Sequence, residues 1–262
     1  MTFLGAKATW RSKNKVIEAF DNSVVFIGMG VVLLAGLVRG FTGFGFSAIC
    51  VALLSFFVDP ALIVPVILMM EVAASVWMMP SVWRDADFKW LLWMMAGLLI
   101  GTPIGVWMLS FLPAETTKLV LYALLLVLAL AGYGQEREII PKFAAPVFVV
   151  GILFGIGNGL AGIAGLIAAI FMISADMEGA RVRASMVVLF FFADLYALLV
   201  GSSFGLIQQD QFLLLGAFLI PLFIGVSIGG WGFRKWGADN YKTIALGLIL
   251  VIALFGIVQV MI

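Results

Sequence analysis

The feature that most constrains the fold is an unbroken apolar run over residues 23–57. A single helix of that length would extend about 50 Å, whereas the hydrocarbon core of a bilayer is about 30 Å thick. Four glycines and one arginine interrupt the run within residues 36–45, GLVRGFTGFG. We therefore predict two half-length helices that meet at a glycine break at membrane depth, as a re-entrant hairpin or as two short spans.

The same pattern recurs 119 positions later, over residues 155–164, GIGNGLAGIA. Gly36, Gly40 and Gly43 align with glycines of the second segment, and Arg39 aligns with Asn158. Residues 101–118 match residues 225–242 in the same way at an offset of 124. A duplicated, glycine-broken intramembrane segment is typical of transporters built from two repeats, with the substrate site at the breaks.

The composition supports a membrane location and narrows the chemistry. The chain is 64% hydrophobic and 11% charged, whereas soluble domains contain about 25% charged residues. It has no histidine and one cysteine, which excludes a His-rich metal cluster, internal disulfides and thiolate metal sites. The net charge of +1 without a basic stripe argues against nucleic acid as a partner. We expect no metal, no cofactor, no enzyme activity and no ATP-binding loop.

The predicted fold class is an all-α polytopic membrane protein. It has two pseudo-repeats, each a glycine-broken, re-entrant-like helix pair followed by three spanning helices. The divisions are a polar N-terminal tail (1–22), a first repeat (23–133), a polar linker (134–143) and a second repeat (144–262). The predicted plain spans cover residues 61–82, 90–111, 117–133, 184–201, 212–233 and 241–261.

Three crossings in each half would invert the second repeat relative to the first. Most basic residues between the spans then fall on one side, which the positive-inside rule places in the cytoplasm. The basic N-terminal tail and Lys118 fall on the other side. The orientation of the termini therefore stays open at this point, as does the oligomeric state.

The two glycine segments, together with the Gly-x-x-Ile-Gly blocks at residues 101–105 and 225–229, resemble the sulfite exporter TauE/SafE family. The resemblance covers nearly the whole chain after residue 22. It implies a permease of the cell membrane (the bacterial inner membrane) that moves small sulfur-containing anions such as sulfite, sulfonates or sulfoacetate. It also implies coupling to an ion gradient, without naming the substrate.

Arg39 is the principal candidate for contact with an anion. Arginine at membrane depth usually faces the protein interior or an aqueous path, and its planar guanidinium suits an oxyanion. Half-helices that begin near Gly43 and Gly162 would add backbone N–H donors. The alternative is that Arg39 reaches an interface or pairs with an internal carboxylate. The other expected members of the substrate site are the break glycines and nearby neutral donors: Gly40, Thr42, Gly43, Ser47, Asn158, Gly159 and Gly162.

Glu71 and Asp194 are the acids furthest from any loop, and they are possible counterparts, 123 positions apart. A carboxylate in mid-membrane is disfavoured when ionised, which makes each a candidate for coupling to protons or another ion. The alternative is a fixed ion pair with an arginine such as Arg39, Arg181 or Arg183. Arg181 and Arg183 precede a span, where we expect them to anchor at the interface.

Glycines at four-residue spacing predict close helix packing over residues 97–105 and 151–159. The function that these patterns favour is secondary transport of a small anion by alternating access, coupled to protons or another ion. The expected partners are the anion, the coupling ion and the lipid bilayer. An anion channel and a non-transporting membrane subunit are the alternatives.

Overall fold

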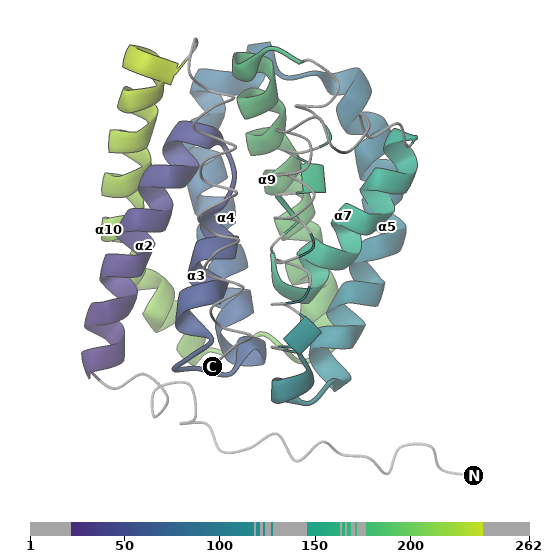
Figure 1. Cartoon of the computed structure of the whole chain (residues 1–262). Coiled ribbons are helices and arrows are strands. Elements are labelled where there is room, and N and C mark those ends of the chain that lie inside the picture. The colour runs from purple at the N-terminus through teal and green to yellow at the C-terminus, as the bar shows by residue number, and fades with distance from the viewer. Residues whose placement is uncertain are drawn as a thin grey trace.

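The structure is a computed structural model that describes residues 22–117, 146–162 and 177–237. It also describes single positions at 119, 120, 123, 127, 164, 165, 167, 168 and 171. Every regular element in this part of the chain is helical (Figure 1). The α-helices are α2 (Asn22–Thr42), α3 (Phe46–Leu54), α4 (Pro60–Val82), α5 (Phe88–Phe111), α7 (Val147–Ala161), α9 (Gly179–Ser203) and α10 (Asp210–Gly232).

Five of the described helices, 20 to 27 residues long, are apolar enough to cross a bilayer, and α7 is a shorter apolar helix. Large apolar side chains cover their outer surfaces; Phe26 and Ile220 are 73% and 69% exposed. Exposure of such side chains is favourable in lipid and unfavourable in water. The prediction of an all-helical, multi-pass membrane protein is therefore confirmed. The predicted spans at 117–133 and 241–261 and the linker at 134–143 fall almost entirely outside the described residues.

The first apolar run breaks where the glycines predict. α2 ends at Thr42 and α3 begins at Phe46, and between them Gly43 and Gly45 have φ of 84° and 88°. Only glycine adopts this left-handed region without steric cost. The expectation of two half-length helices is wrong, however, because α2 has 21 residues and α3 has 9. α2 is long enough to cross the membrane. α3 packs against α2 and runs in the opposite direction (Figure 1).

The boundaries of the plain spans follow local capping. Asp59 caps α4 by accepting from the Ala61 N–H at 2.9 Å, with Pro60 in the first turn. α9 begins at Gly179, five residues before the predicted start of this span at residue 184. At the other end of the described chain, α10 continues into a π-helical turn, η2 (Phe233–Gly237), beyond the predicted end of this span at residue 233.

The two predicted glycine stripes pack against one another. A Cβ added to Gly97 would meet the carbonyl oxygen of Phe148, and a Cβ added to Gly101 would meet that of Ile152. α5 and α7 thus run parallel with their backbones in contact, since only glycine leaves room for the neighbouring carbonyl. The prediction of close packing through small residues is confirmed.

α2 and α10 make the same kind of contact. A Cβ on Gly40 of α2 would meet the carbonyl oxygen of Val226 on α10. A Cβ on Gly159 of α7 would meet that of Thr102 on α5. Gly159 lies 119 positions after Gly40, and Val226 lies 124 positions after Thr102, the same two offsets that relate the sequence segments. α2 and α10 are also parallel.

Contacts at the helix ends establish the directions of the remaining helices (Figure 1). The Gln211 side chain donates to the carbonyl of Leu62, so α10 and α4 begin at the same end of the bundle. The Asp87 N–H donates to Ser185 Oγ, so α9 begins at the end where α4 finishes and α5 starts. Accordingly, α2, α4 and α10 run one way, and α5, α7 and α9 run the other way.

Candidate functional site

Arg39 lies in the last turn of α2 and has no exposed surface. Its Nη2 is 2.9 Å from Glu71 Oε2 on α4 and donates to Ser75 Oγ at 2.8 Å. Its Nη1 donates to the carbonyl of Gly43, in the break, at 2.7 Å. Thus one ion pair and two hydrogen bonds fix the guanidinium against α4 and the glycine break. We expected Arg39 either to contact an anion or to reach an interface or pair with an internal carboxylate. The structure shows the pair with an internal carboxylate, Glu71.

The other oxygen of Glu71 caps α3. Glu71 Oε1 accepts from Ser47 Oγ at 2.6 Å and from the Ser47 N–H at 3.2 Å. Ser47 lies in the first turn of α3, where backbone N–H groups lack intrahelical partners and the helix dipole favours a negative charge. The Glu71 carboxylate therefore sits between a guanidinium and a helix N-terminus, with neither Glu71 nor Arg39 exposed.

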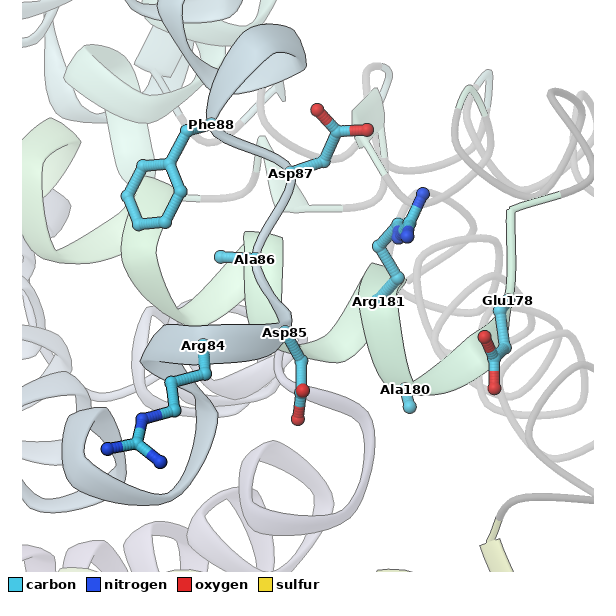
Figure 2. A pocket seen from close by; sticks show the side chains of 8 residues that line it. All are labelled: Arg84, Asp85, Ala86, Asp87, Phe88, Glu178, Ala180 and Arg181. Carbon is cyan, nitrogen blue, oxygen red and sulfur yellow. The ribbon is translucent and has the colours of Figure 1, made fainter.

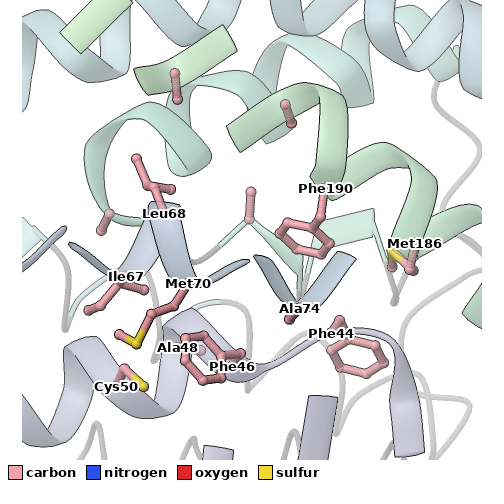
Figure 3. Packing of buried hydrophobic residues seen from close by; sticks show 14 of the residues in the cluster. Phe44, Phe46, Ala48, Cys50, Ile67, Leu68, Met70, Ala74, Met186 and Phe190 are labelled. Atoms are coloured by element: carbon pink, nitrogen blue, oxygen red, sulfur yellow. The ribbon is translucent and has the colours of Figure 1, made fainter. Parts of the chain in front are cut away.

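Apolar rings enclose this centre. The Cζ atom of Arg39 lies 4.4 Å from the centroid of the Phe190 ring on α9, an arrangement that favours the cation. Phe190 belongs to a cluster of buried apolar side chains that also contains Phe44 and Phe46 (Figure 3). In this conformation the Arg39–Glu71 pair has no access to solvent.

Asn158, near the end of α7, makes a second buried polar pair. Its Nδ2 donates to Asp194 Oδ1 on α9 at 2.9 Å, and neither residue is exposed. In the part of the chain that the structure describes, Asn158 Oδ1 and Asp194 Oδ2 have no hydrogen-bond partner. Two buried oxygens without a donor are costly.

The second pair matches the first by position. Ser75 follows Arg39 by 36 residues, and Asp194 follows Asn158 by 36 residues. This equal spacing aligns Asp194 with Ser75, at an offset of 119, whereas the expected pairing of Glu71 with Asp194 needs an offset of 123. The residue 119 positions after Glu71 is Phe190.

The two glycine breaks lie next to each other. Gly162, with φ of 68°, ends α7, and a Cβ built on it would lie 2.8 Å from the Cβ of Ser47. A Cβ on Gly165 would lie 2.8 Å from Phe190 Cζ and 3.2 Å from Phe44 Cβ. The beginning of α3 thus meets the end of α7, with one polar pair on each side.

The remaining candidate residues have structural contacts of their own. Thr42 Oγ1 bonds with the carbonyls of Val38 and Phe44 and supports the break. Gly40 and Gly159 face α10 and α5 in the helix contacts described above. The structure thus brings together one group of candidates and places the rest beside it or in helix packing. The group is Arg39, Gly43, Ser47 and Glu71, with Asn158, Gly162 and Asp194 adjacent.

Arg183 is a buried polar residue whose role the sequence did not reveal. It is 7% exposed, and its Nε and Nη2 donate to the carbonyl of Gly40 at 3.1 and 2.8 Å. It caps the end of α2, one residue from Arg39, and the expected anchoring at the interface is wrong for it. Arg181 is exposed, as expected. The only sequence signal is that Arg183 stands two positions deeper in the apolar helix.

One end of the bundle is basic. Arg39 apart, the described lysines and arginines all lie at the end where α4 and α10 finish and α5 and α9 begin: Arg84, Lys89, Arg181, Arg183, Arg234 and Lys235. The opposite end carries Asp59, Glu115 and Asp210 and, among the described residues, no cation. A hollow of about 440 Å³ opens at the basic end, where Figure 2 shows Asp85, Asp87 and Glu178 arranged around Arg181.

A family model, sulfite exporter TauE/SafE, matches residues 28–256. Among curated proteins and solved structures, none matches the chain. The matched region contains both glycine segments and both buried polar pairs. It also contains the described helices, except for the first turn and a half of α2. The family consists of membrane transporters and is not enzymatic. This chain belongs to the sulfite exporter TauE/SafE family.

Proposed function

We propose that the protein is a secondary transporter of small sulfur-containing anions, in which the anion replaces Glu71 beside Arg39. The observation that carries the proposal is the set of groups that hold the Glu71 carboxylate. One guanidinium, one hydroxyl and one N–H at a helix start surround it. These are the donors that bind the oxygens of a sulfite or sulfonate group. Glu71 thus occupies the place that a substrate oxyanion would take.

Protonation of Glu71 couples the exchange to a proton. A neutral carboxyl no longer needs the guanidinium, so Arg39 and Ser47 become available to an anion. One proton and one monoanion enter the centre together, and its net charge does not change. A charge without a counter-charge is costly in a buried site, so the centre disfavours an anion without a proton.

Asp194 and Asn158 form a candidate second proton site. A proton on Asp194 Oδ2 would be donated to Asn158 Oδ1 and would give both unpartnered oxygens a hydrogen bond. Asn158 stands where the first half has Arg39, so this side offers a proton site without a cation. Asp194 therefore belongs to the coupling machinery, and the anion binds on the Arg39 side.

Two inverted repeats would supply the alternating access. The support is that α2, α4 and α5 each run opposite to the helix at the corresponding place in the second half: α7, α9 and α10. Equivalent glycines also make equivalent backbone contacts in the α2–α10 and α5–α7 pairs. Each close-packed pair contains one helix from each half and moves as a unit, with α4 and α9 between them.

The basic end of the bundle is the cytoplasmic end in this proposal. The positive-inside rule favours this orientation, since the described surface cations lie at that end alone. The membrane is then the cell membrane, the bacterial inner membrane for this family. The basic N-terminal tail and Lys118, which weighed against this orientation, lie outside the described residues.

The test is counterflow of labelled anion in proteoliposomes. Sulfite, sulfate, thiosulfate, sulfoacetate, taurine and acetate would compete with a labelled sulfonate, for the wild type and for Arg39→Gln. We expect saturable exchange of one sulfur anion that Arg39→Gln abolishes while the protein remains folded. Non-saturable flux would favour an anion channel. Absence of exchange for every anion, from folded wild-type protein, would contradict the proposal and favour a non-transporting membrane subunit.

A further inference from the structure

A small pocket at the basic end lies apart from the Arg39–Glu71 centre. Its volume is about 210 Å³, below the 300–1,000 Å³ of sites that hold drug-sized ligands. Residues from the end of α4, the start of α9, the second half of α10 and η2 line it: Trp77, Met78, Ser81, Arg183, Val226, Ser227, Gly230 and Arg234. The pocket is therefore large enough for a small ion or for one polar head group.

The charges in this pocket have one sign. Two arginines line it, and its described lining contains no carboxylate. A Cβ built on Gly230 would lie 3.6 Å from Arg183 Nη2 and 3.9 Å from Arg234 Nη1, so the two guanidinium groups converge on the same backbone position. An anion beside both guanidinium groups would be attracted by two positive charges.

The two arginines differ in how they are held. Arg183 is buried, and two of its nitrogens hold the carbonyl of Gly40. Arg234 is exposed, and within the described residues it makes no hydrogen bond or ion pair with another side chain. Arg234 can thus turn toward a ligand, while Arg183 contributes a positive charge from a fixed place.

A neutral donor completes the set. Ser227 Oγ accepts from the indole N–H of Trp77 at 3.2 Å. Because that bond uses a lone pair of the hydroxyl, the Ser227 O–H remains able to donate. A guanidinium and a hydroxyl donor facing one small space are suited to an oxyanion.

We propose that this pocket is a second anion site, which binds the oxyanion group of a small sulfonate, sulfite or phosphate ester. Arg234 and Ser227 donate to the oxygens, and Arg183 supplies the second charge. The same chemistry fits a free anion and the head group of an anionic lipid. Binding of an oxyanion here is independent of the proposed transport. A role of this pocket as the first binding site of the transported anion rests on the proposed function. Its support is that Arg183 binds the carbonyl of Gly40, the residue next to Arg39.

The neighbouring larger hollow does not share this chemistry. Arg84 and Arg181 line it together with three carboxylates, those of Asp85, Asp87 and Glu178 (Figure 2). An anion there meets more negative than positive charge. The preference for an anion is thus expected in the pocket with Arg234 and not in the hollow.

The test measures charge selectivity at the pocket itself. Ser81 lines the pocket and is exposed, and the native cysteine, Cys50, is buried. Ser81→Cys would be modified in phosphatidylcholine nanodiscs by two methanethiosulfonates, one with an ethylsulfonate group and one with an ethyltrimethylammonium group. We expect the anionic reagent to react faster, and the ratio of the two rate constants to fall on the order of tenfold with Arg234→Gln.

Lys235→Gln is the matched control. It removes the same charge one residue away, from a side chain that lies on Trp231 and Trp236 and does not line the pocket. The ratio should stay within about twofold of the Ser81→Cys parent. An equal fall with Lys235→Gln would show a general surface potential and contradict the site. So would an unchanged ratio with Arg234→Gln, or absence of reaction with either reagent.

Two additions separate the sources of the anion. Methanesulfonate in phosphatidylcholine nanodiscs should slow modification of Ser81→Cys if the ligand is free in solution. Phosphatidylglycerol in the nanodisc should slow it without added anion if the ligand is a lipid head group. Slowing by neither would contradict the proposal. Because labelling needs no transport, loss of anion selectivity here and loss of counterflow are separate failures.

Discussion

Glu71→Gln removes the counter-charge of Arg39 while it keeps the shape of the side chain. At the observed separation of 2.9 Å, the attraction is about 6 kcal/mol for an effective dielectric constant of 20. Desolvation of both groups opposes it, and loss of one partner from a buried pair costs about 3–5 kcal/mol. We expect Glu71→Gln to lower the free energy of unfolding by about 3–5 kcal/mol. The melting temperature should fall on the order of 10 °C.

Arg39→Met should be milder, because the partner that it leaves can become neutral. The Glu71 carboxylate can take up a proton, whereas a guanidinium cannot release one. The double variant leaves no charge in the centre. Its penalty should be smaller than the sum of the single penalties by about 2 kcal/mol or more.

The assay uses the single cysteine of the chain. Cys50 is fully buried on α3, so a thiol-reactive fluorogenic dye reports the melting of the helix that Glu71 caps. Unfolding in a denaturing detergent gives the free energies, and Asp85→Asn, at an exposed position, is the control for loss of an acid. Penalties that add in the double variant, or a Glu71→Gln protein as stable as the wild type, would refute the reasoning.

Three other changes test the helix packing, the second polar pair and the cap on α2. Gly40→Ala should cost about 1–3 kcal/mol because its Cβ would meet the backbone of Val226, whereas Gly30→Ala, with nothing within 4 Å, should be neutral or slightly stabilising in the same melting assay. Asp194→Asn should keep the melting temperature and reduce proton movement in proteoliposomes, and an unchanged proton flux would remove Asp194 from the coupling machinery. Arg183→Gln should destabilise by about 1–3 kcal/mol, since a buried carbonyl loses two charged donors; a wild-type melting curve would show that the cap is dispensable.

The glycine break could be predicted because its cause is local. The run over residues 23–57 is too long for one straight span, and a positive φ at Gly43 requires glycine. The start of α4 at Asp59 and Pro60 is local too. Neither depends on which helix packs beside which. The unequal lengths of α2 and α3 were missed because apolar composition does not mark how the run divides.

The partner of Arg39 could not be predicted because it depends on how α4 is rotated. Most of α4 is buried and apolar on every side, so no hydrophobic periodicity indicates which face meets α2. The sequence left open whether Glu71 or Asp194 pairs with Arg39, Arg181 or Arg183. In the structure Glu71 and Ser75, one turn apart on α4, both point to Arg39.

The sequence also could not predict which helices pack against each other. Glycines at four-residue spacing predict a close contact but do not name the partner, because any helix with a similar stripe fits. The stripe on α5 meets α7, and α2 meets α10, so each contact joins the two halves. Arg183 was missed for a related reason: an arginine near a helix start fits an interface anchor until a buried carbonyl is found beside it.

Proton movement driven by a sulfonate gradient tests the central claim most directly. Proteoliposomes with a pH-sensitive dye inside would receive an inward gradient of the sulfonate that counterflow identifies, with protein-free liposomes as the control. We predict that the wild type acidifies the interior, with at least one proton for each monoanion. Glu71→Gln, held well below its melting temperature, should move at least one proton fewer for each anion while it still exchanges labelled anion. Wild-type sulfonate flux without protons, or undiminished proton flux in Glu71→Gln, would contradict exchange of the Arg39–Glu71 pair for a proton and an anion.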